Sequence, residues 1–233
     1  MQRYLFCLTL LGLFLFAACA GRAPQNDQAA TTRDDKMTTS AVTTTPGKSL
    51  PKIVAFGDSL TAGLGLSTAE SYPSVLQEKL RADGYQYEVV NAGVSGDTSA
   101  GGVRRVDWSL EGDVRVVIIE LGANDLLRGQ PVAEMKKNLG AIIERAESRN
   151  AKVLLAGMYS LTSLGSDYQR EVHEAFQSLA REHDVPLIPF FLEGVAGDAK
   201  LNQPDGVHPN ADGTRIVAET VYRYLRPMLD EEK

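Results

Sequence analysis

From residue 50 onward, short apolar runs of strand length alternate with longer segments of helical periodicity. The apolar runs are continuous, which is typical of strands that a parallel sheet buries on both faces. These runs predict strands at residues 52–56, 86–91, 114–121, 152–157 and 186–190. The intervening segments predict helices at residues 73–83, 131–149, 168–183 and 211–229.

This alternation predicts a single α/β domain over residues 51–233, in which an open parallel five-stranded sheet lies between two layers of helices. Right-handed crossovers are expected to join its strands. In sheets of this kind, ligands bind beyond the carboxyl ends of the strands, where the connecting loops meet. We therefore expect functional residues in the loops that directly follow strands.

The N-terminus has the features of an export signal. A basic start at Arg3 is followed by an apolar run that is too short for a comfortable membrane span. The run ends in LFAAC, which resembles a bacterial lipobox with Phe in place of the usual Leu. Residues 1–19 therefore predict a signal peptide with Cys19 as a lipid anchor. The mature protein is then expected on the periplasmic side of a membrane of the cell envelope. Cleavage at Ala18-Cys19-Ala20 is the alternative, and it would release a soluble periplasmic or secreted protein.

The segment after the predicted signal peptide has the composition of a linker. Residues 20–50 are rich in Thr, Ala, Gln and Asp, so they predict a flexible linker. Both cysteines, Cys7 and Cys19, precede it, which excludes a disulfide or thiolate metal site further along.

Residues 51–233 carry 19 basic and 27 acidic side chains, a net charge of −8. Such a surface repels phosphate, which disfavours nucleic acid and favours neutral substrates or substrates whose charge lies far from the reacting bond.

The first polar motif, Gly57-Asp58-Ser59-Leu60, directly follows a predicted strand. Its glycine permits a tight exit, and a serine at this point would direct its Oγ into the ligand crevice. The alternative is that Asp58 or Ser59 only caps the following turn. Thr61 stands where a Gly-x-Ser-x-Gly elbow has its last glycine, which disfavours an α/β-hydrolase.

Two further motifs follow the next two strands. In the segment 91–98, Gly93 can present a backbone N–H at close range because it has no Cβ, although a plain turn is the alternative. In the segment 122–125, the Asn124 side chain can direct an N–H at a developing oxyanion, although Asn is also an ordinary turn residue.

The fourth motif, residues 205–209, precedes the last predicted helix. Asp205 and His208 stand at the two ends of a four-residue turn, which brings their Cα atoms within about 7 Å and allows a hydrogen bond that fixes the imidazole tautomer. Pro209 keeps His208 in an extended backbone. His208 is therefore the candidate base, whereas His173 and His183 lie in a helical pattern and are expected to be surface or hydrogen-bonded residues.

Taken in order, Ser59, Gly93, Asn124 and His208 resemble the four blocks of the SGNH, or GDSL, hydrolase superfamily. The resemblance covers residues 52–229 and is greatest to bacterial acyl-ester hydrolases of the thioesterase I, lysophospholipase L1 and arylesterase type. It implies a flavodoxin-like three-layer α/β/α fold and an activity that needs no cofactor and no metal.

The resemblance also implies a role for each residue. Ser59 is the expected nucleophile, His208 its base, and Asp205 the acid that orients the imidazole. The backbone N–H groups of Ser59 and Gly93 and the Asn124 side chain are the expected oxyanion donors, and the expected substrates are small acyl or aryl esters, including thioesters. Two alternatives remain open: a carbohydrate acetylesterase of the same superfamily, and a non-enzymatic envelope lipoprotein.

The sequence says less about the substrate pocket. Residues 157–165 follow the fourth predicted strand and are expected to form one wall of the crevice. The similar hydrolases typically have a loop with Pro and Asn here, which this chain lacks, so their acyl-chain preferences do not transfer. Leu161, Leu164 and Trp108 are candidates either for an acyl pocket or for the core.

Overall fold

Five parallel strands form one sheet in the order β2-β1-β3-β4-β5. The structure is a computed structural model that describes residues 49–159 and 165–231. The strands are β1 (Lys52–Gly57), β2 (Glu88–Gly93), β3 (Val114–Glu120), β4 (Lys152–Ala156) and β5 (Leu187–Ile188). All five predicted strands are confirmed, with shifted ends, and β5 is the shortest. The predicted signal peptide, and the linker as far as residue 48, lie outside the described residues.

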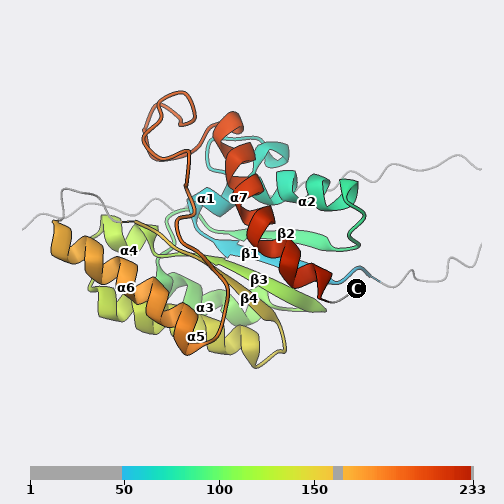
Figure 1. The fold of residues 1–233 in the computed structure, drawn as a ribbon, viewed down its shortest axis with the longest axis horizontal. Helices are drawn as coiled ribbons and strands as arrows, with labels where there is room; N and C mark the ends of the chain where they lie inside the picture. Colours follow the sequence, from blue (N-terminus) through green and yellow to red (C-terminus); the bar gives the residue numbers. More distant parts are fainter. Residues whose placement is uncertain (1–48, 160–164, 232–233) are drawn as a thin grey trace, which may run out of the picture. The chain divides into compact units, whose positions relative to one another are not determined.

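Helices cover both faces of this sheet. They are α1 (Ser59–Ala62), the 3-10 turn η1 (Thr68–Glu70), α2 (Tyr72–Ala82), α3 (Ser99–Ser109), α4 (Ala123–Leu127), α5 (Val132–Glu147), α6 (Ser166–Glu182) and α7 (Ala211–Asp230). Figure 1 shows α2 and α7 on one face, and α3, α5 and α6 on the other. Contacts join α2 to α7, α3 to α5, and α5 to α6. The predicted three-layer α/β/α architecture is confirmed.

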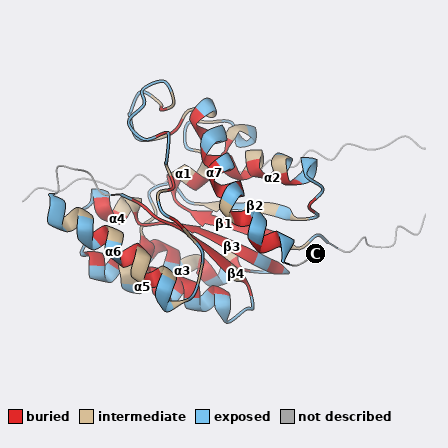
Figure 2. Cartoon of the chain, in the orientation of Figure 1, coloured by how far each residue is buried: buried red, intermediate tan, exposed pale blue. Residues whose placement is uncertain are grey.

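The core lies on both sides of the central strands, as Figure 2 shows. In β1, the side chains from Ile53 to Phe56 are at most 1% exposed, and in β3 those from Val116 to Ile119 are fully buried. Burial on both faces explains why these runs are continuously apolar. The edge strand β2, by contrast, has no fully buried residue.

The sequence analysis missed α3, because two adjacent glycines lower its helix propensity. The structure shows why Gly102 is there: a Cβ at this position would lie 2.5 Å from Leu121 Cδ1 and 3.0 Å from Ile142 Cδ1. Glycine therefore lets α3 pack closely against the sheet and α5. Thr98 caps the helix, since its Oγ1 accepts the Gly101 N–H at 3.3 Å. The short helices α1 and α4 and the turn η1 were also not predicted.

The strand register brings the polar motifs to one edge of the sheet. Gly57, the last residue of β1, pairs with Gly93 of β2 on one side and with Glu120 of β3 on the other. The three strands thus end in line, and the segments that follow them leave the sheet together. Among the described residues, no helix has the length and apolarity needed to cross a membrane.

Candidate active site

Ser59 opens α1 immediately beyond the end of β1. Asp58 caps this short helix, because its Oδ1 accepts a hydrogen bond from the Leu60 N–H at 3.0 Å. The helix ends at Gly63, whose φ of 76° lies in the left-handed region. The structure therefore holds the Ser59 hydroxyl at the carboxyl edge of the sheet, where the motif predicts it.

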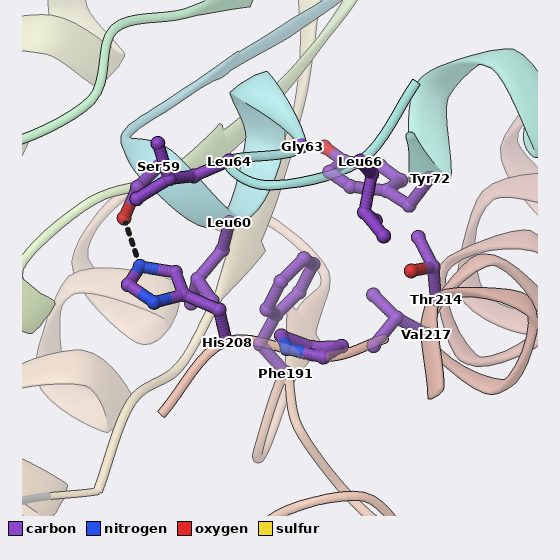
Figure 3. A pocket seen from close by; sticks show the side chains of 11 residues that line it. Ser59, Leu60, Gly63, Leu64, Leu66, Tyr72, Phe191, His208, Thr214 and Val217 are labelled. Atoms are coloured by element: carbon purple, nitrogen blue, oxygen red, sulfur yellow. Dashed lines mark hydrogen bonds between the residues drawn. The ribbon is translucent and has the colours of Figure 1, made fainter. Parts of the chain in front are cut away.

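His208 meets Ser59 across 149 positions of the sequence. Ser59 Oγ lies 2.8 Å from His208 Nε2 (Figure 3), and His208 Nδ1 lies 2.7 Å from Asp205 Oδ2. An ionised carboxylate can only accept hydrogen bonds, so Nδ1 carries the proton and Nε2 is free to accept one from the serine. The structure thus brings together the three side chains expected as nucleophile, base and acid.

The loop that carries Asp205 is exposed but internally bonded. Asp205 Oδ1 accepts the N–H groups of Val207 at 2.9 Å and His208 at 3.0 Å. The bonds from the His208 and Val207 backbone, followed by the bond from the imidazole, lower the pKa of Asp205 to about 2. Asp205 is therefore ionised throughout the neutral range and can stabilise a positive imidazole at position 208.

Gln203 joins this loop to the segment that follows α1. Its Nε2 donates to the carbonyl oxygens of Leu64 at 2.7 Å and Pro209 at 3.0 Å, and its backbone N–H donates to His208 O at 2.7 Å. A Cβ at Gly65 would lie 2.2 Å from Gln203 Oε1, so glycine lets the two segments approach. The sequence analysis missed Gln203, since nothing local distinguishes it from an ordinary polar loop residue.

Asn124 lies on α4, and its side chain turns back toward β1. Its Nδ2 donates to Asp58 Oδ2 at 3.0 Å, and the second N–H of the amide makes no hydrogen bond within the described part of the chain. The next residue, Asp125, is buried and accepts the Ser99 N–H at 2.8 Å and the Ser99 hydroxyl at 2.6 Å. The bonds of Asp125 anchor α4 to the start of α3. Asn124, which uses one N–H for Asp58, keeps its second N–H for a ligand.

Gly93 does not fit the role expected of it. Its N–H donates to Asn91 Oδ1 at 3.0 Å, so this donor is already used within β2. A Cβ on Gly93 would lie 2.2 Å from the Ala62 nitrogen, which means that glycine is required here for the close approach of β2 to α1. The close approach that the sequence suggested is present, but it is to the chain's own backbone.

Gly96 is the residue of the same motif whose N–H remains available. It has a φ of +83°, and its N–H has no hydrogen-bond partner among the residues that the structure describes. Its carbonyl accepts a hydrogen bond from Arg128 Nη2 at 2.9 Å, which ties this turn to the end of α4. Within the segment 91–98 the sequence analysis predicted Gly93 and not Gly96; the signal for Gly96 was its position in the turn, away from the strand.

A small pocket, partly open to solvent, lies beside the Ser59–His208 pair (Figure 3). Apolar side chains that follow Ser59 line one side of it, and apolar side chains from the C-terminal third of the chain line the other. They include Leu60, Leu64, Leu66, Phe191 and Val217. The surface next to the reacting atoms is therefore mainly apolar.

The remaining predictions have mixed outcomes. Trp108 is 72% exposed and lines neither the core nor this pocket. Leu161 and Leu164, in the expected wall of the crevice, lie outside the described residues. His173 bonds Gln177 Nε2 at 2.9 Å and His183 lies 3.4 Å from a Glu147 carboxylate oxygen, so both have partners of their own, as expected.

A serine, an imidazole and a carboxylate in hydrogen-bonded series, at the carboxyl edge of a parallel sheet, are the arrangement of a serine hydrolase. Residues 55–216 match the GDSL-like Lipase/Acylhydrolase family, and the chain belongs to this family.

Named relatives agree with this assignment. Esterase TesA of Pseudomonas aeruginosa is 40% identical over 178 residues, which cover 76% of this chain and 89% of that protein. Thioesterase 1/protease 1/lysophospholipase L1 of Escherichia coli is 34% identical over 181 residues, which cover 77% and 86%. A crystal structure of TesA superposes with a TM-score of 0.74 at 39% identity and covers 76% of this chain and 99% of that one.

These findings confirm the SGNH resemblance and the fold class, and they identify the chain as an ester-bond hydrolase of the serine esterase type. The hypothesis of a non-enzymatic lipoprotein is therefore set aside.

Proposed function

We propose that this esterase works through an acyl-enzyme on Ser59, with His208 as base and Asp205 as its orienting acid. His208 Nε2 takes the hydroxyl proton as Ser59 Oγ bonds to the ester carbonyl carbon. When the tetrahedral intermediate collapses, the bond to the leaving group breaks and His208 returns the proton to it. Water repeats the sequence and releases the acid. The observation that carries this proposal is the Ser59–His208–Asp205 series, at 2.8 and 2.7 Å.

Three donors are proposed to hold the oxyanion: the N–H groups of Ser59 and Gly96 and the second amide N–H of Asn124. Each is free of other hydrogen bonds within the described residues, which supports the assignment. In this scheme Gly96 replaces Gly93, whose N–H is bonded to Asn91. Loss of one such donor typically lowers kcat about 10²–10³-fold.

Ser59→Ala tests the mechanism with p-nitrophenyl butyrate. We expect a loss of at least about 10⁴-fold in kcat, because a nucleophile cannot be replaced by binding alone. Ser148→Ala, at an exposed serine that follows α5, is the matched control and should keep the wild-type rate. Hydrolysis by folded Ser59→Ala at the wild-type rate would overturn the mechanism.

The substrates that we propose are acyl esters and thioesters with a short or medium apolar group. The apolar lining beside Ser59 supports this choice, as does the naming of one relative as a thioesterase and lysophospholipase. Rates on p-nitrophenyl esters of two to twelve carbons, an acyl-CoA, a lysophospholipid and an acetylated glycan would rank the substrates. Activity confined to the glycan would favour the carbohydrate acetylesterase instead.

We also propose that the enzyme is exported and anchored by a lipid on Cys19, on the periplasmic side of a membrane. The support is the sequence alone: a basic start, an apolar run, and Cys19 after two alanines. Mass spectrometry of the mature N-terminus is the test. A diacylglycerol-modified Cys19 is expected, and an N-terminus beyond residue 19 without lipid would establish the soluble alternative.

A further inference from the structure

Two carboxyl groups lie fully buried behind the nucleophile, and the mechanism above uses neither. Asp58 directly follows β1 and Glu120 ends β3, and both are 0% exposed. Glu120 Oε2 accepts the Asp58 N–H at 3.2 Å and the Thr61 hydroxyl at 2.7 Å. Neither carboxyl has a salt-bridge partner in the described part of the chain. Buried acids without a cation are costly and call for a physical account.

The fold makes room for this arrangement. A Cβ on Gly57 would lie 2.0 Å from Thr61 Oγ1 and 2.4 Å from Glu120 Oε2. Only glycine therefore allows the strand end to pass beside the Glu120 carboxyl. Glu120 Oε1 and the Tyr72 hydroxyl are also buried, and neither has a hydrogen-bond partner among the described residues.

The surroundings place the negative charge on Asp58. Burial raises the pKa of Asp58 to about 6, opposed by hydrogen bonds from the Leu60 N–H and Asn124 and by the charge of His208. Complete burial, and then the neighbouring charge of Asp58, raise the pKa of Glu120 well above its ordinary value. Two carboxylates in one buried space do not both ionise, so at neutral pH one proton remains on Glu120.

The other groups that face this pair are identifiable. The charge of His208 acts on the pair from the loop before α7, and Tyr72 faces it from α2, where burial raises the pKa of its phenol. From α3, Arg105 Nη2 donates to Gly57 O at 2.8 Å and its Nε pairs with Asp97 at 2.6 Å. Arg105 thus has its own carboxylate partner, and the Asp58–Glu120 pair keeps a single negative charge.

This charge bears directly on Asn124. The amide can in principle present either its NH₂ or its oxygen to Asp58, since the two orientations differ by a half rotation. A negative Asp58 Oδ2 accepts Nδ2–H at 3.0 Å and repels the amide oxygen. The flipped orientation would bring oxygen, rather than N–H, toward the substrate.

We propose that Asp58 and Glu120 form a buried pair with a single negative charge, carried by Asp58, which fixes the direction of the Asn124 amide; Asp58 is the positioning residue and Glu120 its neutral support. The proposal rests on the proposed role of Asn124 as an oxyanion donor. It assigns a positioning role to two acids whose burial without a cation is costly.

A double-mutant cycle on kcat tests the Asp58 step. With p-nitrophenyl butyrate at pH 8, Asn124→Ala should lose about 10²–10³-fold. Asp58→Asn should lose about 10–10²-fold, with KM changed less than about threefold, and the double variant should match Asn124→Ala within about threefold, because the two changes remove one interaction.

The outcomes separate two failures. If the two losses multiply in the double variant, or if Asp58→Asn keeps the wild-type kcat, Asp58 does not act through Asn124 and the proposal is overturned. If Asn124→Ala itself keeps the wild-type kcat, the oxyanion role of Asn124 fails, and with it the proposed function at that residue. A purely structural role of Asp58 would give multiplied losses.

Thermal unfolding tests the Glu120 step without any assay of activity. A carboxyl with a raised pKa in the fold contributes stability that is full below the unfolded pKa and is lost as the pH rises through the folded pKa. Wild-type Tm should therefore fall from pH 5 to pH 8 by more than the Tm of Glu120→Gln. Glu88→Gln, at an exposed glutamate of β2, is the control and should follow the wild type. Equal pH dependence in Glu120→Gln and wild type would overturn the neutral Glu120.

Discussion

The acidic groups on the two sides of Ser59 differ in their exposure to solvent and in how their charge is set. On one side, the loop 202–209 presents His208 and Asp205 close to solvent, and Asp205 keeps its charge through backbone N–H bonds. On the other side, Asp58 and Glu120 are fully buried, and burial restricts them to one charge. The exposed side is suited to proton transfer from Ser59, because water can solvate the charge that appears on the imidazole. The buried side is suited to fixing the orientation of the Asn124 amide, because no water competes for the hydrogen bonds of Asp58 and Glu120.

The largest expected effect lies on the exposed side. Asp205→Asn should lower kcat by about 10⁴-fold, because an amide at this position no longer fixes the tautomer that leaves Nε2 free. Asp58→Asn should lose far less, so the ratio between the two variants measures how different the two sides are. Steady-state rates on p-nitrophenyl butyrate at pH 8 give both numbers, and similar losses in the two variants would contradict the division of roles.

The two glycines of the motif 91–98 have different expected roles, Gly93 in packing and Gly96 in catalysis. Gly96→Ala keeps the N–H but places a side chain at positive φ, which displaces this donor. It should lower kcat about 10–10²-fold, less than complete removal of a donor, at a stability cost of about 1 kcal/mol. Gly93→Ala should instead cost about 1–3 kcal/mol or more, because its Cβ meets the Ala62 backbone. Kinetics and thermal unfolding of both variants test this. Unchanged kcat in Gly96→Ala, with reduced kcat in folded Gly93→Ala, would restore Gly93 as the donor.

The pH dependence of kcat/KM should depend on both Asp58 and His208. Asp58 must be ionised, and burial raises its pKa to about 6, so activity falls as the pH drops through that value. His208 must also be unprotonated, because a protonated imidazole cannot act as base. The acid limb of log kcat/KM should therefore be steeper than one, and it should return to a slope of one in Asp58→Asn. A slope of one in the wild type would mean that protonation of only one group limits the activity, which would contradict a requirement for ionised Asp58.

The smallest effect is expected at the contact that joins the two segments. Gln203→Ala should lower kcat about three- to tenfold with little change in KM, because its bond to Leu64 O holds the base loop beside the nucleophile. Gln203→Glu places an acceptor against that carbonyl and should not restore the rate. Gln86→Ala, at an exposed loop glutamine, is the control. A rise in KM at constant kcat would instead place Gln203 in substrate binding.

Several site features could be predicted because they depend on neighbours in the sequence. Ser59 directly follows a strand, and Asp205 and His208 share one turn, so their local chemistry was visible without a fold. The choice between Gly93 and Gly96 was not visible, since it depends on which N–H is used by Asn91. The exposure of Trp108 was likewise a matter of how α3 packs.

The pattern of residues is enough to predict the parallel sheet, because continuously apolar strands of this length are typical of sheets buried between two layers of helices. It also determined which kinds of side chain leave the ends of the strands. The contacts of those side chains depend on the folded chain, because Asp58 and Glu120 are 62 positions apart in the sequence and Ser59 and His208 are 149 positions apart. Strand register and loop packing bring them together, and burial then sets their charge, which is a property of the folded surroundings and not of any residue alone.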